Sequence, residues 1–112
     1  TGNKIEDFGV GFFTKYGDGA CDLAPLSGLT KRRVKEIGGF LGAPLSLVNK
    51  KPTADLENLC PQRLDEDAYG VTYDEIDNFL EGKEINADSK KIILDAFKKT
   101  EHKRQPPLVF SQ

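Results

Sequence analysis

Three consecutive cations, Lys31, Arg32 and Arg33, occupy the first turn of a predicted helix. Thr30, directly before them, suits the capping position because its hydroxyl can accept a hydrogen bond from a free backbone N–H group. The helix dipole is positive at this end and disfavours each cation by about 0.3–1 kcal/mol. A bound phosphate would relieve that conflict, since N–H groups and cations would converge on it. The alternative interpretation is a solvated basic face whose side chains spread into water.

A second basic cluster, His102, Lys103 and Arg104, lies near the end of the chain. Taken alone, it is typical of a frayed helix end, where cations complement the negative end of the dipole. The whole chain has 16 Lys and Arg against 18 Asp and Glu. Two basic clusters in a chain with that balance favour a ligand that carries phosphate groups.

Two adjacent carboxylates, Glu6 and Asp7, lie near the start of the chain. Proteins commonly hold Mg²⁺ through one or two carboxylates together with phosphate oxygens. In a phosphate-binding site, one of these acids could therefore be a metal ligand. The alternative is a pair of surface acids at the start of a helix.

The composition is globular, with 38% hydrophobic and 30% charged residues in a chain of 112. This length suits one small domain, or a piece of one, with a modest core. A net charge of −2 attracts neither nucleic acid nor an anionic membrane, and no apolar run approaches the ~20 residues of a membrane span. Cys21 and Cys60 fit no metal-binding spacing, so they predict either a disulfide or two thiols in a reducing cytosol.

The elements that must position these residues are predicted to be mostly helices. The clearest signal begins at Thr72, which forms a capping box with Glu75 and precedes an apolar stripe. Weak periodicity predicts a long loop over residues 53–70, and loops of that length are usually functional or mobile. The predicted helices cover residues 4–8, 30–41, 44–51, 72–80 and 86–99.

Only one or two brief strands are predicted, at the apolar runs of residues 10–13 and 21–26, and such strands would have no partner sheet in this chain. Pro25 confines the second to an edge or to a very short length. The sequence also opens at Thr1 without a cap or leader. We therefore expect a domain whose βα-rich portion lies upstream of these residues.

Several sequence strings, taken together and in order, are more specific than any one of them. They are TGNKIED, GFFTKYGDG, the segment Asp22–Leu26, KKPTADL, DEDAYGVTYDEIDNFLEGK and EHKRQPP. Over roughly residues 1–107 they resemble the carboxyl-terminal half of the ammonia-dependent NAD synthetases. That family belongs to the adenine-nucleotide alpha-hydrolase-like group of ATP pyrophosphatase type.

The resemblance implies an α/β, Rossmann-like fold whose parallel sheet lies largely upstream, so that a mostly helical carboxyl-terminal portion remains here. Residues 1–29 would end the α/β core, and residues 30–52 would form helices. Residues 53–70 would be a mobile active-site loop, whose acidic part orders over the reacting groups. Residues 71–112 would form the last helices and the tail.

The implied reaction is the ATP-dependent amidation of deamido-NAD to NAD. The carboxylate attacks the α-phosphate of ATP and releases pyrophosphate, and ammonia then displaces AMP from the adenylate. Mg²⁺ is the implied cofactor and ATP a co-substrate. The family also implies a cytoplasmic homodimer that binds deamido-NAD across its interface, with no nucleic-acid or membrane partner. The ending of the sequence favours use of free ammonia.

The resemblance assigns roles to individual residues. Glu6 matches the Mg²⁺ ligand, and Asp7 is the second choice, because one extra residue separates that acid from Gly11. The residues that match ATP contacts are Thr1, Lys31 and Thr53. Those that match deamido-NAD contacts are Lys15, Asp22, His102 and Lys103.

One departure from the family concerns its phosphate-binding sequence, SGGxDS, which does not occur in these 112 residues. We therefore expect residues 1–112 to be inactive by themselves. A function of a different class stays open, namely a non-catalytic helical module for dimerisation or nucleotide binding.

Overall fold

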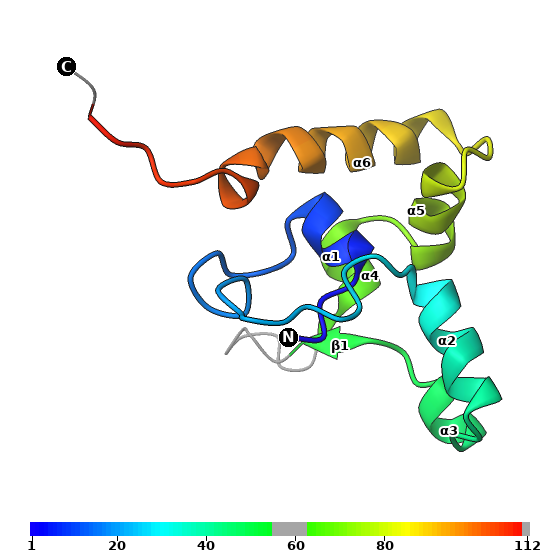
Figure 1. The fold of residues 1–112 in the computed structure, drawn as a ribbon. Coiled ribbons are helices and arrows are strands. Elements are labelled where there is room, and N and C mark those ends of the chain that lie inside the picture. The colour runs from blue at the N-terminus through cyan, green and yellow to red at the C-terminus, as the bar shows by residue number, and fades with distance from the viewer. Residues whose placement is uncertain (55–62, 111–112) are drawn as a thin grey trace.

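The computed structural model describes residues 1–54 and 63–110, which are mainly helical (Figure 1). The helices are α1 (Ile5–Val10), α2 (Lys31–Phe40), α3 (Leu45–Val48), α4 (Asp65–Tyr69), α5 (Tyr73–Leu80) and α6 (Ala87–Lys99), followed by the 3₁₀-helix η1 (Glu101–Arg104). Two short strands, β1 (Thr53–Ala54) and β2 (Arg63–Leu64), pair antiparallel with Thr53 opposite Leu64. None of the helices in the described part is long and apolar enough to span a membrane.

The helices form an open arrangement with principal extents of 56 × 34 × 32 Å. Figure 1 shows α6 running along one side of the molecule, with α1 and α5 beneath it. The α2–α3 pair projects from the body on the side opposite the carboxyl-terminal tail. The helices α1, α5 and α6 contact one another, and α2 joins this group through α5.

The hydrophobic core is small, and among the described residues Val71, Ile76 and Ile93 form its central cluster. It lies where α5 and α6 pack together, and the partly buried Val10 of α1 and Phe79 extend it. Such a core leaves little reserve of stability, because a short chain buries a limited share of its surface.

The apolar stripe predicted on α2 forms but is not buried by the described residues. Phe40 is 90% exposed and Leu41 is 75% exposed, and Leu45 of α3 is 74% exposed. Periodicity thus predicted the helix correctly, whereas the covering surface that such a stripe ordinarily packs against is not among these residues.

The start of α5 confirms the predicted capping box. The Thr72 hydroxyl accepts a hydrogen bond from the Glu75 N–H (3.1 Å), and the Glu75 carboxylate accepts one from the Thr72 N–H (3.2 Å). Two otherwise unsatisfied donors are thereby paired, which fixes where this helix begins.

The prediction of one continuous loop over residues 53–70 is wrong for the described part, which holds β1, β2 and α4. A five-residue helix is too short to show a clear 3.6-residue period. Its three acids, Asp65, Glu66 and Asp67, suit the positive end of the helix dipole. The middle of the segment, residues 55–62, lies outside the described residues.

The strands predicted at residues 10–13 and 21–26 do not form. Gly11 instead ends α1 with a left-handed φ of 75°, and the Phe12 N–H donates to the carbonyl of Asp7 (2.9 Å). The second segment runs into a turn, in which the Ser27 N–H donates to the carbonyl of Ala24 (3.1 Å). In the first segment Phe13 packs on Phe8 of α1 with ring centroids 5.0 Å apart, whereas Leu23 of the second is 76% exposed. A short apolar run alone does not distinguish these roles from a strand.

We expect Ile76→Ala to lower the free energy of unfolding of residues 1–112 by about 2–4 kcal/mol, because it leaves a cavity in a fully buried position. Leu45→Ala is the control, and at an exposed site it should change that free energy by less than about 0.5 kcal/mol. Urea denaturation monitored by circular dichroism measures both. Equal effects at the two positions would contradict this placement of the core.

Candidate functional site

The amino-terminal end of α2 is bound by side chains of the protein itself. The Lys31 N–H donates to Glu6 Oε1 (2.5 Å), and the Arg32 N–H donates to Asp77 Oδ2 (3.1 Å). The Arg33 N–H donates to the Thr30 hydroxyl (3.2 Å), so the predicted cap is confirmed. The expectation that free N–H groups await a phosphate here is wrong, because side-chain oxygens of the protein already accept hydrogen bonds from these three N–H groups.

These two carboxylates, Glu6 and Asp77, are each only 1% exposed. One oxygen of each, Glu6 Oε2 and Asp77 Oδ1, has no hydrogen-bond partner among the described residues. Burial, together with the neighbouring Asp77 carboxyl, raises the pKa of Glu6 to about 8. The pair therefore favours a state with at most one full negative charge near neutral pH, since two adjacent buried carboxylates ionise together only at high cost.

The side chains of the three cations at this helix start diverge. The Arg32 guanidinium donates to Glu81 (2.9 Å) and Asn78 (3.0 Å), while Arg33 pairs with Glu36 (2.9 Å). Both arginine side chains are therefore engaged in contacts within the protein itself.

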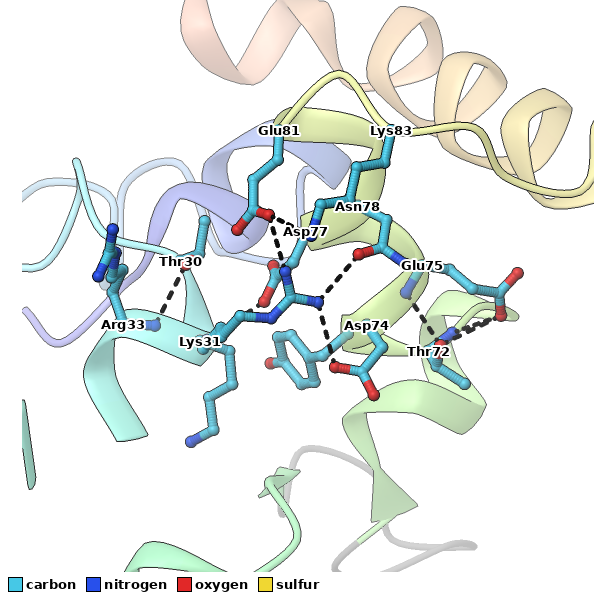
Figure 2. Close-up of polar contacts among 12 residues, drawn as sticks. Thr30, Lys31, Arg33, Thr72, Asp74, Glu75, Asp77, Asn78, Glu81 and Lys83 are labelled. Atoms are coloured by element: carbon cyan, nitrogen blue, oxygen red, sulfur yellow. Dashed lines mark hydrogen bonds and ion pairs between the residues drawn. The ribbon is translucent and has the colours of Figure 1, made fainter. Parts of the chain in front are cut away.

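Lys31 differs from both arginines, because its ammonium has no ion-pair partner in the part of the chain that the structure describes. Figure 2 shows its side chain extending away from the labelled Asp77, Asn78 and Glu81. Burial lowers the pKa of Lys31, and the nearby cations Lys4 and Lys35 lower it further. Of the first basic cluster, Lys31 is thus the cation that remains available to an anionic ligand.

Residues of the second basic cluster bind the carboxyl-terminal end of α1. The Lys103 ammonium donates to the carbonyls of Gly11 and Phe13 (2.7 Å each), and the Arg104 guanidinium donates to the carbonyl of Phe8 (2.8 Å). These carbonyls lie at or just beyond the last turn of α1, where cations complement the negative end of the dipole. The interpretation that these cations complement the negative end of a helix dipole is correct, but the helix is α1 and not the one that directly precedes them in the sequence.

Three of the residues predicted to contact deamido-NAD, namely Lys15, His102 and Lys103, lie together near the carboxyl-terminal end of α1. The Lys15 ammonium donates to the carbonyl of His102 (2.9 Å), next to Lys103. The His102 ring is exposed and has no hydrogen bond to the described residues. Asp22, the fourth member of that predicted set, is exposed on the connection before α2.

Thr53 and residues 2–4 line one cavity of about 220 Å³. Lys4, Asp7 and Asp65 also line it. The amino group of Thr1 donates to the carbonyl of Leu23 (2.8 Å). Of the predicted ATP contacts, Thr53 therefore lines this cavity, whereas Thr1 is not one of its lining residues.

Asp7, the second choice for a metal ligand, is fully engaged. Its Oδ2 accepts hydrogen bonds from the Lys4 N–H (2.8 Å) and ammonium (3.1 Å), and its Oδ1 accepts one from the Tyr69 hydroxyl (2.8 Å). Within the described residues, no cluster of three or more His, Cys, Asp or Glu could hold a metal ion. Glu6 Oε2 has no hydrogen-bond partner in this part of the chain but is buried, so the choice of Glu6 over Asp7 as a metal ligand stays a prediction.

Sequence reasoning missed Asp77, which completes the binding of the α2 start. The available signal was its position four residues after Tyr73, which places it near the inward stripe of α5. An acid beside a buried stripe requires a partner, and here the partner is a backbone N–H group of another helix.

Comparison with known proteins gives a consistent result. The model of the family described as NAD synthase matches residues 1–107. The NH(3)-dependent NAD(+) synthetase of Aliivibrio fischeri is 59% identical over 97 residues, which are 87% of this chain and 35% of that protein. The protein of that name from Streptomyces coelicolor is 58% identical over 98 residues, 88% of this chain and 36% of its own length.

A solved structure, that of NMN synthetase from Francisella tularensis, is similar to this chain with a TM-score of 0.86 at 38% identity. The similarity covers 98% of this chain and 45% of that one. The chain spans about a third of the length of the two relatives above, in their carboxyl-terminal part. The resemblance inferred from the sequence strings is confirmed.

The Glu6 carboxyl should make stability depend on pH. Its pKa is about 8 in the folded chain and near the ordinary 4.5 when unfolded, so the folded state holds more protons between these values. The contribution is fully present below about pH 4.5 and is lost as pH rises through 8. We expect the free energy of unfolding to fall by about 1–3 kcal/mol between pH 5 and 9.

Glu6→Gln is the matched control, because an amide keeps the shape and cannot ionise. Urea denaturation across this pH range should give a flatter dependence for the variant, which should be the more stable protein at pH 9. Parallel curves for the two proteins would contradict the assignment.

Proposed function

This chain belongs to the NAD synthase family, and on that premise we propose that it is the carboxyl-terminal part of a ligase that amidates deamido-NAD with ammonia and ATP. The observation that carries the proposal is the match over residues 1–107. Identity of 58–59% to proteins named NH(3)-dependent NAD(+) synthetase supports this choice of reaction. A parallel sheet in the remainder of a Rossmann-like fold is part of the same proposal, as is a cytoplasmic homodimer.

The proposed reaction has two displacements. A carboxylate oxygen of deamido-NAD attacks the α-phosphorus of ATP, and the bond to the pyrophosphate oxygen breaks. Ammonia then attacks the acyl carbon, AMP leaves with its oxygen, and the nitrogen loses a proton to give the amide. The protein mainly has to place two nucleotides and offset phosphate charge.

The ATP side of this proposal uses Thr1, Lys31 and Thr53. Lys31 is the best supported of the three, because its ammonium lacks a described partner at the start of α2. We assign Glu6 to a shared Mg²⁺, because one of its carboxylate oxygens has no hydrogen bond in the described part. The carboxyl is 1% exposed and has a pKa of about 8, so it would have to lose its proton and become accessible to serve as a ligand. When bound, such an ion would offset charge on the phosphates that leave.

The deamido-NAD side uses Lys15, Asp22, His102 and Lys103. Two of these, Lys15 and Lys103, already bond to backbone carbonyls. We therefore expect His102, whose ring has no described partner, to make the most sensitive contact with this nucleotide.

A second candidate function is synthesis of NMN instead of NAD. The supporting observation is the TM-score of 0.86 to a structure named NMN synthetase. The two functions differ in whether the acid that is amidated is a dinucleotide or a mononucleotide, so the preferred substrate decides between them.

A chimera tests the proposed function. The 97-residue segment of the Aliivibrio fischeri protein that matches this chain is replaced by the corresponding residues of this chain. We expect the purified chimera to convert deamido-NAD to NAD and to release AMP and pyrophosphate in equal amounts. The unaltered Aliivibrio protein is the control. A folded chimera that forms no NAD would refute the proposal, and preference for nicotinic acid mononucleotide would favour the second candidate.

Lys31→Ala in the chimera should lower kcat/KM for ATP by about 10–100-fold, the scale of a lost charge-assisted hydrogen bond of roughly 1.5–3 kcal/mol. Lys35→Ala, one turn further along α2, is the matched control and should change it less than about threefold. His102→Ala should instead raise the KM for deamido-NAD. If Lys31→Ala and Lys35→Ala behave alike, the Lys31 ammonium does not contact a phosphate.

A further inference from the structure

We propose that Tyr69 is a positioning residue whose hydroxyl fastens α4 to α1 and so sets Thr53 and Lys4 beside the ATP-binding groups. No resemblance assigned a role to Tyr69, and the sequence predicted only a loop there. The inference rests on the proposed function for the identity of the ligand. The fastening itself is visible in the described residues.

A line of short oxygen contacts joins the helices α1, α4 and α5 through two tyrosines. The Tyr69 hydroxyl donates to Asp7 Oδ1 of α1 (2.8 Å) and lies 3.1 Å from the Tyr73 hydroxyl. The Tyr73 hydroxyl in turn donates to Asp65 Oδ2 at the start of α4 (2.9 Å). Asp7, Asp65 and Tyr73 are 5%, 7% and 6% exposed, so the contacts are largely shielded from water. Shielded networks of this kind bind more strongly than isolated exposed pairs.

Both phenols serve as donors in this arrangement. Burial raises the pKa of Tyr69 above its usual value, as do the adjacent Tyr73 and Asp7. Burial likewise raises the pKa of Tyr73. The hydroxyl hydrogens therefore remain in place at neutral pH, where they bind the two carboxylates.

The ring of Tyr69 is held independently of its hydroxyl. It packs edge-on against Phe12 with ring centroids 5.1 Å apart, and against Tyr73 with centroids 5.4 Å apart. Removing the hydroxyl alone should keep this packing and release only the hydrogen bonds.

A separate contact ties α4 to α5, because the Tyr73 N–H donates to Glu66 Oε2 (2.7 Å). The Tyr69 hydroxyl reaches α1 instead, through Asp7. Loss of this one hydroxyl should therefore loosen α4 from α1 while α4 stays joined to α5.

The fastening bears on the proposed ATP site from two directions. Asp7 uses its second oxygen to hold both the N–H and the ammonium of Lys4, the cation that also acts on Lys31. At the other end, the Asp65 N–H donates to the carbonyl of Pro52 (3.0 Å), directly before Thr53. The position of α4 on α1 thus sets how Thr53 and Lys4 face each other across their cavity.

Amide hydrogen exchange on residues 1–112 tests the fastening without reference to the reaction. Tyr69→Phe should speed exchange of the hydrogen-bonded Asp65 and Gly70 amides by about tenfold, while the amides of α6 keep their rates. Tyr16→Phe, which changes a 71% exposed tyrosine, is the matched control and should alter neither. Unchanged exchange in α4, or an equal rise throughout the chain, would overturn the inference.

Kinetics of the chimera test whether the fastening positions the nucleotide. Tyr69→Phe should raise the KM for ATP about fivefold or more and leave the KM for deamido-NAD within twofold. Equal effects on both substrates would reduce Tyr69 to a general structural contact and overturn its positioning role. An inactive unsubstituted chimera would instead refute the proposed function, and the exchange data would still decide the fastening.

Discussion

The structure depends most on how the start of α2 is bound. Glu6 of α1 and Asp77 of α5 accept hydrogen bonds from two consecutive backbone N–H groups of α2. Helix starts otherwise present unsatisfied donors, so these two carboxylates fix three helices relative to one another in a single place. The contact is costly as well as strong, because each carboxylate keeps one buried oxygen without a partner in the described part. The stability of this arrangement therefore depends on whether Glu6 is protonated.

The same contact changes how the basic residues are understood. The charge pattern of the sequence predicts two basic clusters that bind phosphate. In the structure, however, most of these cations bind acids or backbone carbonyls of the protein itself. Arg32 and Arg33 bind acids of the fold, and Lys103 and Arg104 bind the end of α1. Under the proposed function, Lys31 is left to meet ATP from the first cluster. The larger part of the phosphate charge must then be offset by groups outside the described residues.

The sequence predicted the parts of the fold that local rules determine. The capping box of Thr72 and Glu75 places α5 correctly, because both partners lie within one turn. The contacts of Glu6 with Lys31, and of Asp77 with Arg32, could not be predicted in this way. They join residues 25 and 45 positions apart, and no spacing rule connects them. Helix α4 was missed for a different reason, since five residues give too few turns for a period to show. The roles assigned to Thr1, Thr53 and His102 came from resemblance and remain predictions.

The closing of α1 by the end of the chain has a consequence for biosynthesis. Arg104 binds the carbonyl of Phe8 across 96 positions of sequence, and Lys103 reaches Gly11 across 92. A ribosome synthesises α1 before Lys103 and Arg104, so the carbonyls at the end of α1 lack these partners until those two residues have been added. Contacts of such wide separation also slow the search for the native state.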